Sequence, residues 1–233
     1  MIRMQRKKKV AIFDIDGTIF RSSLLIESVE ALIDEGIFPR SVRKIYSPAH
    51  RNWLDRKSGY DQYIAAVIQA SDTHIKGVRQ KDYVRVVRSV VREHKNRVYR
   101  YTRDLIKELK RKNYFLIAVT HSPKYIADAF AKTLKFDKVY GRLFEIDAQG
   151  RFTGKFLHLD LIRDKAKILK RAVEKENLTL RGSVGVGDTE SDTPFLKLVD
   201  RPICFNPNSK LYRFAKRRGW PVVVERKDVI YHL

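Results

Sequence analysis

The sequence predicts an α/β protein: a doubly wound parallel (Rossmann-like) sheet core with a small all-helical cap domain inserted after the first strand. Two observations predict the core. Short apolar runs such as Val10–Phe13 and Tyr114–Val119 are typical of strands buried on both faces, and such runs alternate with helical patterns. The third observation is that no convincing strand lies between Phe20 and Val98, where apolar residues recur at helical spacing. The insert is therefore expected to be all-helical.

The composition is that of a folded chain. With 233 residues, 43% of them hydrophobic and 33% charged, the chain can bury one sizeable core plus a modest insertion. No apolar run approaches the ~20 residues that cross a bilayer. Only Val10–Phe13 follows the basic start of the chain, too short a run for a secretory signal, so we expect a cytoplasmic protein. A single cysteine, Cys204, excludes an intramolecular disulfide framework.

The net charge is +22, from 49 Lys and Arg against 27 Asp and Glu. Such an excess raises the hypothesis of a nucleic-acid or membrane partner. The positive charge is spread roughly in proportion to chain length, whereas a dedicated nucleic-acid surface usually concentrates it. We therefore expect a generally basic surface that attracts small anionic substrates, and nucleic acid is the less favoured partner.

The helices and strands are expected in a definite order. In the insert, Pro39 and Pro48 interrupt the stretch between the first two helices. Helices are expected at residues 22–34, 61–69, 79–94, 101–112, 123–134 and 164–176, and strands at 138–140, 183–186, 202–205 and 221–224. Residues 143–154 alternate in polarity, which predicts a hairpin. The chain thus divides into a discontinuous core, 1–20 and 98–233, and a helical cap, 21–97.

Chemically suggestive residues follow the predicted strands. Loops at the carboxyl ends of strands converge on one crevice in a doubly wound sheet. The residues at or near these ends are Asp14, Asp16, Thr120, Ser122, Asp188 and Asp192, with Lys165 at the start of a helix between them. Each one alone has an ordinary explanation, such as a turn, a helix cap or a solvated charge. Together they supply a nucleophile, a cation and metal ligands, which is what phosphoryl transfer requires.

In this order the motifs resemble those of the haloacid dehalogenase (HAD) superfamily. FDIDGT at Phe13–Thr18 is similar to the first motif, VTHS at Val119–Ser122 to the second, Lys165 to the third and GDTESD at Gly187–Asp192 to the fourth. Residues 205–223 further resemble the phosphoserine-phosphatase-like branch, called subfamily IB. The resemblance spans the whole predicted core and implies a phosphoric monoester hydrolase, that is, a phosphatase.

The resemblance implies roles for the carboxylates. Asp14 would attack phosphorus and form an aspartyl-phosphate intermediate, and Asp16 would protonate the leaving oxygen and then activate water. Mg²⁺ would be held by Asp14, by the backbone carbonyl of Asp16 and by Asp188. Asp192 would either bind the metal directly or contact one of its ligands. The metal would offset the repulsion between the nucleophile and an anionic substrate.

The resemblance also implies a phosphate-binding set. Thr120 would donate a hydrogen bond to a phosphoryl oxygen, and Lys165 would hold charge on both Asp14 and the phosphate. The contacts expected for the phosphate are Gly17, Thr18, Thr120, His121, Ser122 and Lys165.

The insert bears on the substrate, because in this superfamily it covers the crevice and selects the leaving group. Phosphoserine phosphatases usually carry a glutamate shortly after the first motif to meet the substrate amine; this chain has Ser23 there and Glu27 as the nearest acid. His121 stands where small residues are common, so phosphoserine is not assigned. A basic stripe lies on the third insert helix and consists of Lys81, Arg85, Arg88 and Arg92. The favoured interpretation is that these residues form the solvent-exposed face of an amphipathic helix; the alternative is that they bind a second anionic group of the substrate.

Two alternatives stay open. The aspartyl phosphate could pass to an acceptor hydroxyl, which would make the protein a phosphotransferase. The chain could also bind nucleic acid or phosphate without turnover, although carboxylates in the pocket repel phosphate unless a metal intervenes. The sequence leaves the physiological substrate and the oligomeric state open.

Overall fold

The computed structural model describes residues 7–233, so residues 1–6 lie outside the described part. The strands are β1 (Lys9–Asp14), β2 (Phe115–Pro123), β3 (Lys138–Ile146), β4 (Phe152–Leu157), β5 (Thr179–Gly187), β6 (Arg201–Phe205), β7 (Val222–Arg226) and β8 (Val229–His232). They form one eight-stranded sheet in the order β4-β3-β2-β1-β5-β6-β7-β8.

The core of the sheet is parallel, as predicted. Strands β3, β2, β1, β5, β6 and β7 pair in parallel, whereas β4 pairs antiparallel with β3 and β8 antiparallel with β7. The sheet as a whole is therefore mixed, because a short turn brings each edge strand back beside its predecessor. The predicted hairpin is β3–β4. Strand β8 was not predicted; it is a four-residue edge strand, and three of its residues are exposed.

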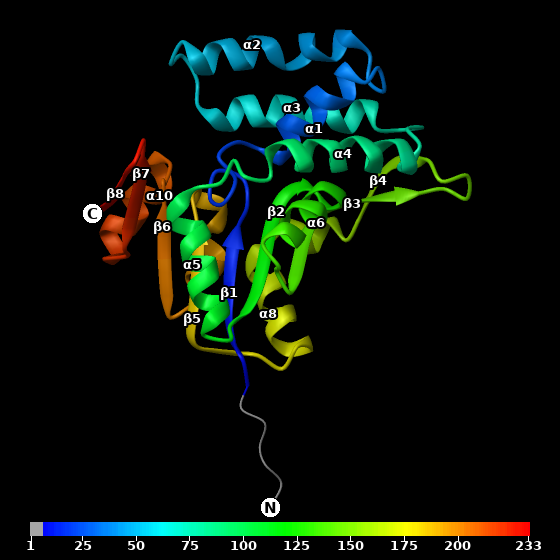
Figure 1. The fold of residues 1–233 in the computed structure, drawn as a ribbon. Helices are drawn as coiled ribbons and strands as arrows, with labels where there is room; N and C mark the ends of the chain where they lie inside the picture. The colour runs from blue at the N-terminus through cyan, green and yellow to red at the C-terminus, as the bar shows by residue number, and fades with distance from the viewer. Residues whose placement is uncertain (1–6) are drawn as a thin grey trace, which may run out of the picture.

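Helices cover both faces of the sheet (Figure 1). One face is covered by α5 (Arg100–Arg111) and α6 (Lys124–Thr133), and the other by α7 (Leu159–Arg163), α8 (Lys165–Lys175), α9 (Thr193–Leu196) and α10 (Ser209–Arg218). Strand β1 is buried on both sides: Ala11 and Phe13 belong to one hydrophobic cluster and Val10 and Ile12 to the other. This follows from the alternation of side chains along a strand.

A layer of helices lies above the carboxyl ends of the strands (Figure 1). It contains α1 (Leu24–Asp34), α2 (Arg43–Leu54), α3 (Tyr60–His74) and α4 (Gln80–His94), and no named strand lies between β1 and β2 in the described chain. Tyr83 of α4 packs edge-on against Phe144 and Phe152 of the β3–β4 hairpin, with ring centroids 6.1 and 5.3 Å apart. The layer thus shares a hydrophobic core with the sheet. The division into 1–20 and 98–233 against 21–97 remains our proposal.

Helix α2 was not predicted, because Pro48 lies inside it and a proline removes one backbone hydrogen bond from a helix interior. Contacts with neighbouring helices hold the segment instead. Arg43 Nε lies 2.8 Å from Glu30 Oε2 of α1, and His50 stacks on Tyr63 of α3 with ring centroids 4.5 Å apart. Tertiary packing therefore outweighs the local penalty of the proline.

No helix within residues 7–233 combines the length and the apolar character needed to cross a bilayer.

Candidate active site

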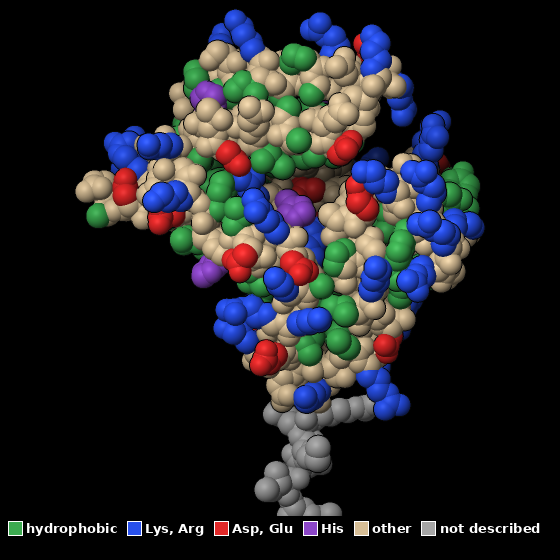
Figure 2. Space-filling view, turned by 180° about the vertical axis from the view of Figure 1, so that it is seen from behind, with side chains coloured by type: hydrophobic (Ala, Val, Ile, Leu, Met, Phe, Trp, Pro, Cys, Tyr) green, Lys and Arg blue, Asp and Glu red, His purple; other side chains and the backbone are tan. Residues whose placement is uncertain are grey.

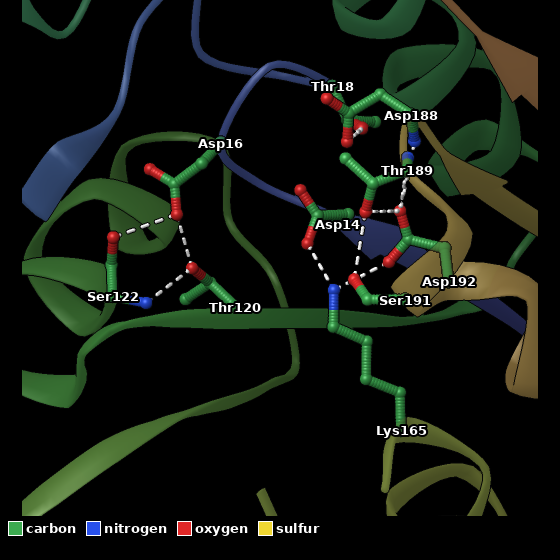
Figure 3. A network of polar contacts seen from close by, with 10 residues as sticks. All are labelled: Asp14, Asp16, Thr18, Thr120, Ser122, Lys165, Asp188, Thr189, Ser191 and Asp192. Carbon is green, nitrogen blue, oxygen red and sulfur yellow. Dashed lines mark hydrogen bonds and ion pairs between the residues drawn. The ribbon is translucent and has the colours of Figure 1, made fainter. Parts of the chain in front are cut away.

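The strand order reverses at β1, which lies between β2 and β5. In sheets of this type ligands bind beyond the carboxyl ends of the strands at the point of reversal. Asp14 is the last residue of β1, Thr120 lies near the end of β2, and Asp188 follows directly after β5. The structure thus brings the residues singled out in the sequence to one place (Figure 3).

Lys165 links two of the carboxylates. Its Nζ lies 2.6 Å from Asp14 Oδ1 and 2.5 Å from Asp192 Oδ1 (Figure 3). The exposed fractions of Lys165 and Asp192 are 2% and 0%. Asp164 directs the lysine inward as the N-cap of α8, where its carboxylate accepts hydrogen bonds from two amides of the first turn. Lys165 is therefore a buried ionic link and not a solvated helical charge.

Burial and mutual repulsion dominate the electrostatics of the site. Burial raises the pKa of Asp14 well above its usual range; the charge of Lys165 opposes this rise, and the charges of Asp192 and Asp16 add to it. Burial and the charges of Asp14 and Asp192 likewise raise the pKa of Asp188 well above its usual range. Burial alone would lower the pKa of Lys165, but Asp14 and Asp192 raise it. The site holds more negative charge than one ammonium group neutralises.

Asp16 is bound on both carboxylate oxygens. Its Oδ1 accepts a hydrogen bond from the backbone amide of Leu24, the first residue of α1, at 2.6 Å. Its Oδ2 accepts from Ser122 Oγ at 2.8 Å and from Thr120 Oγ1 (Figure 3). Burial raises the pKa of Asp16, while the hydrogen bonds from Thr120, Leu24 and Ser122 oppose the rise. The start of the helical layer is thus tied to the loop after β1.

Gly17 lets the loop after β1 approach the loop after β5. Its φ is +79°, and a Cβ there would lie 2.3 Å from Asp188 Oδ2. The next residue, Thr18, is fully buried and donates from its hydroxyl to Asp188 Oδ1 at 3.1 Å. Four donor groups of the site therefore all bind carboxylates: the hydroxyls of Thr18, Thr120 and Ser122 and the ammonium of Lys165.

Asp192 is bonded on both sides as well. Besides the link from its Oδ1 to Lys165, its Oδ2 accepts hydrogen bonds from the backbone amides of Asp188 and Thr189, each at 3.0 Å. Its carboxylate therefore holds the backbone of the loop after β5 and links that loop to Lys165.

Two carboxylate oxygens remain free in the crevice. No residue in the range 7–233 donates a hydrogen bond to Asp14 Oδ2 or Asp188 Oδ2, and neither is a buried atom without a partner, so both reach solvent. No three Asp, Glu, His or Cys side chains in that range form a metal-binding group by themselves. Mg²⁺ is usually bound by one or two carboxylates and keeps several waters. Two free, mutually repelling carboxylates fit this ion.

His121 lies at the same edge of the sheet, between Thr120 and Ser122. Burial, and then the charge of Lys165, lowers the pKa of His121 to about 4. The imidazole is therefore neutral near pH 7. Seen from behind, the molecule is hollowed beneath the helical layer, and acidic and histidine side chains lie within the hollow (Figure 2).

The sequence analysis missed Tyr60, the first residue of α3. Burial and the negative charge of Asp16, with smaller contributions from Tyr63 and Asp188, raise the pKa of Tyr60. Tyr60 packs edge-on against Trp53 and Tyr63 of the helical layer, and 40% of the residue stays exposed. No motif marks this tyrosine, because only the packing of α3 brings it near Asp16.

Glu27, the acid nearest to Ser23 in the sequence, is already engaged. Its Oε1 lies 2.9 Å from Arg97 Nη1, and its Oε2 lies 3.6 Å from His94 Nε2. Ser23 itself is buried at the N-cap of α1. Glu27 is therefore not free to bind an ammonium group of a substrate.

We expect Asp188→Asn to stabilise the protein in the presence of a chelator. The substitution removes a buried charge whose pKa is raised, and the amide oxygen can still accept from Thr18. The expected gain is about 1 to 2 kcal/mol, or about 2 to 8 °C in Tm. A raised folded-state pKa means that the charge costs stability above the unfolded-state pKa, so the gain should grow from pH 4 to pH 7. Thermal unfolding in EDTA checks this, and a lower Tm for the variant would contradict it.

Comparisons with known proteins agree with this arrangement. A family model described as haloacid dehalogenase-like hydrolase matches residues 11–197. The histidinol-phosphatase of Neisseria meningitidis serogroup C is 20% identical, over 93% of this chain and 98% of the relative. Phosphoserine phosphatase SerB1 of Mycobacterium tuberculosis is 25% identical, over 91% of this chain and 69% of the relative.

Among solved structures, a Bordetella pertussis protein of unknown function superposes with a TM-score of 0.75 at 18% identity, over 93% of this chain and 98% of that chain. At this identity the likeness shows the fold alone. The family model covers most of the chain, including Asp14, Lys165 and Asp188. The chain therefore belongs to the haloacid dehalogenase-like hydrolase family.

Proposed function

We propose that the protein is a Mg²⁺-dependent phosphatase that hydrolyses a phosphate monoester through an aspartyl-phosphate intermediate on Asp14. The family match and the phosphatase names of two relatives support a phosphatase. The observation that carries the proposal is the buried Lys165–Asp14 link beside Asp188 at the reversal point of the sheet. A protein that only bound phosphate would gain nothing from these carboxylates, because they repel an anion.

In the proposed reaction, Asp14 Oδ1, the carboxylate oxygen that the metal would leave free, attacks phosphorus while the bond to the leaving oxygen breaks. Asp16 gives its proton to that oxygen, and burial, which raises the pKa of Asp16, favours the protonated form that this step needs. Water then attacks the aspartyl phosphate and loses a proton to Asp16. Inorganic phosphate leaves, and both carboxyl groups return to their starting states.

The other residues hold the reacting groups. Lys165 orients Asp14 and balances the charge that develops on the phosphate, and Asp192 holds Lys165 in place. Thr120 and Ser122 orient Asp16 and can share their hydroxyls with the phosphate. The backbone amides of Gly17 and Thr18 already donate within their own loop, and the Thr18 hydroxyl acts through Asp188. Asp14 Oδ2, Asp188 Oδ2 and the Asp16 carbonyl would hold Mg²⁺, which when bound neutralises charge between the nucleophile and the substrate.

The proposed substrate is a small phosphate monoester. The basic stripe of α4 does not serve it: Lys81, Arg85, Arg88 and Arg92 are exposed, and Arg85 pairs with Glu35 at 2.8 Å. Arg88 and Arg92 border a cavity of about 560 Å³ between α4 and α6 that none of the site carboxylates lines. This placement favours the solvated-face interpretation of the stripe. Because Glu27 is bound by Arg97, we do not propose phosphoserine as the substrate.

The test is phosphate release from a panel of monoesters, with and without Mg²⁺. The panel holds phosphoserine, sugar phosphates, nucleotides, lysophosphatidate and p-nitrophenyl phosphate. We expect turnover that stops on chelation and returns with Mg²⁺. Independently of turnover, Mg²⁺ at 100 times its Kd should stabilise the wild type by about 2.7 kcal/mol but leave Asp188→Asn nearly unchanged.

Turnover that continues after chelation would contradict the assignment of Mg²⁺ as cofactor. Adding a small alcohol separates hydrolysis from transfer, since a phosphotransferase makes a new ester in place of free phosphate. Absence of turnover on every ester by folded, Mg²⁺-stabilised protein would favour a transferase or a phosphate binder. A polynucleotide substrate would show itself by a steep loss of activity with salt.

A further inference from the structure

Arg142 is a buried cation beside the site that the proposed reaction does not use. It lies in β3, where its register partner in β2 is Pro123, the residue after Ser122. Only 7% of Arg142 is exposed. Burial and the charge of Lys165 are the main causes of the low pKa of His121, and Arg142 contributes to it as well. Its register places Arg142 at the carboxyl edge of the sheet, beside the segment of β2 that carries Thr120 and Ser122.

Two contacts orient the guanidinium group. Arg142 Nη2 lies 2.6 Å from both Oδ1 and Oδ2 of Asp72, which belongs to α3 of the helical layer. Arg142 Cζ lies 4.2 Å from the ring centroid of Phe156 in β4, so one face of the group rests on the aromatic ring. A guanidinium held in this way is preorganised and loses little conformational entropy when it binds an anion.

Two donor nitrogens of the guanidinium remain open. No residue of the described chain accepts a hydrogen bond from Arg142 Nε or Nη1. Across residues 7–233, Ser58 Oγ is the single buried side-chain nitrogen or oxygen without a partner, so both Arg142 nitrogens touch solvent. Lysine and arginine side chains border the hollow beneath the helical layer (Figure 2). A charged N–H donor that is open to solvent can form a charge-assisted hydrogen bond with a carboxylate or a phosphate.

We infer that Arg142 is a subsite for a second anionic group of the substrate, a carboxylate or a phosphate carried by the leaving group. The inference rests on the proposed phosphatase function. Asp72 and Phe156 are then positioning residues, because they fix the plane of the guanidinium and do not touch the substrate. The cation of this subsite comes from the sheet and not from the basic stripe of α4.

The test uses matched substrates. Phosphooxy carboxylic acids of increasing chain length are compared with their primary amides, which have the same shape without the charge. Alkanediol bisphosphates of the same lengths show whether a phosphate is preferred to a carboxylate. p-Nitrophenyl phosphate, which has no second anion, reports the chemistry alone.

The decisive variant is the pair Arg142→Leu with Asp72→Leu, since removing both partners leaves no unpaired buried charge. At one chain length we expect the wild type to prefer an anionic substrate over its amide by about 10- to 100-fold in kcat/KM. The double variant should lose this preference through KM and keep its turnover of p-nitrophenyl phosphate. Arg142→Lys, which keeps the charge without the planar fork, should keep part of the preference.

Equal kcat/KM for acids and amides in the wild type would overturn the inference. So would a double variant that keeps the preference, or one that loses p-nitrophenyl phosphate turnover by the same factor, because the ion pair would then be merely structural. Should the wild type hydrolyse nothing, the proposed function fails separately. The binding affinities of the acids and of their amides, measured by calorimetry, then test the Arg142 subsite. A tighter binding of the acids does not depend on turnover.

Discussion

Asp14→Asn is expected to fold like the wild type and to lower turnover of any phosphate monoester by about 10⁴-fold or more. The amide is a poor nucleophile toward phosphorus, while its oxygen can still accept the hydrogen bond that Lys165 makes to Asp14 Oδ1 at 2.6 Å. Because burial raises the pKa of Asp14, removal of its charge should not cost stability. Phosphate release and thermal unfolding, measured on the same preparation, check both statements.

Asp104→Asn is the matched control. This aspartate of α5 undergoes the same chemical change with a side chain 51% exposed and paired with Arg103. It should keep wild-type turnover.

Acid quenching of the wild type during turnover should also trap phosphate on the peptide that contains Asp14, in a form that hydroxylamine releases. Turnover by Asp14→Asn at the wild-type rate, or a label on another peptide, would remove Asp14 from the role of nucleophile.

Lys165→Met is expected to destabilise the protein by about 3 to 5 kcal/mol, the usual cost of removing one partner from a buried charged pair. Asp14 and Asp192 would both lose the ammonium that lies 2.6 and 2.5 Å from them. Turnover should fall as well, because the nucleophile is no longer oriented. Urea unfolding measures the loss, with an unchanged m-value showing that the unfolded state is the same.

The loss should depend on pH. Without Lys165, burial is unopposed and the folded-state pKa of Asp14 rises further. A carboxyl whose folded-state pKa is raised costs stability above its unfolded-state pKa, so the penalty should shrink as the pH falls from 7 toward 4. Lys170→Met, an exposed lysine on the same helix, should change stability by less than about 0.5 kcal/mol at any pH. A pH-independent loss in Lys165→Met would show that packing, not charge, holds this residue.

Much of the fold could be predicted from the sequence, because strand and helix periodicity are local properties of the chain. The runs that became β1 and β2 are apolar at every position, as strands buried on both faces require. The helices expected at 22–34, 79–94 and 164–176 are present as α1, α4 and α8 with small shifts at their ends. Helix α2 was missed because packing against α1 and α3 stabilises it in spite of Pro48.

The sequence by itself determined which chemical groups stand at the ends of the parallel strands: the Asp14–Asp16 pair, Thr120 and Asp188. A parallel sheet places such ends along one edge, so their proximity follows from local pattern and topology together. Only the tertiary structure decided how they are bonded. The Leu24 amide that binds Asp16 belongs to the backbone and leaves no signature in the sequence.

Tertiary structure also decided the surroundings of the site. Arg142 follows the end of the strand predicted at 138–140, where attention to strand ends could have found it, yet its partner Asp72 lies 70 residues away in the chain. Glu27 is withdrawn from the site by Arg97, also 70 residues away. Such pairings depend on how the helical layer packs on the sheet. Periodicity and motif spacing predict the secondary structure of each segment by itself. Contacts between distant segments form only when those segments pack into a common core, so the local pattern does not predict them.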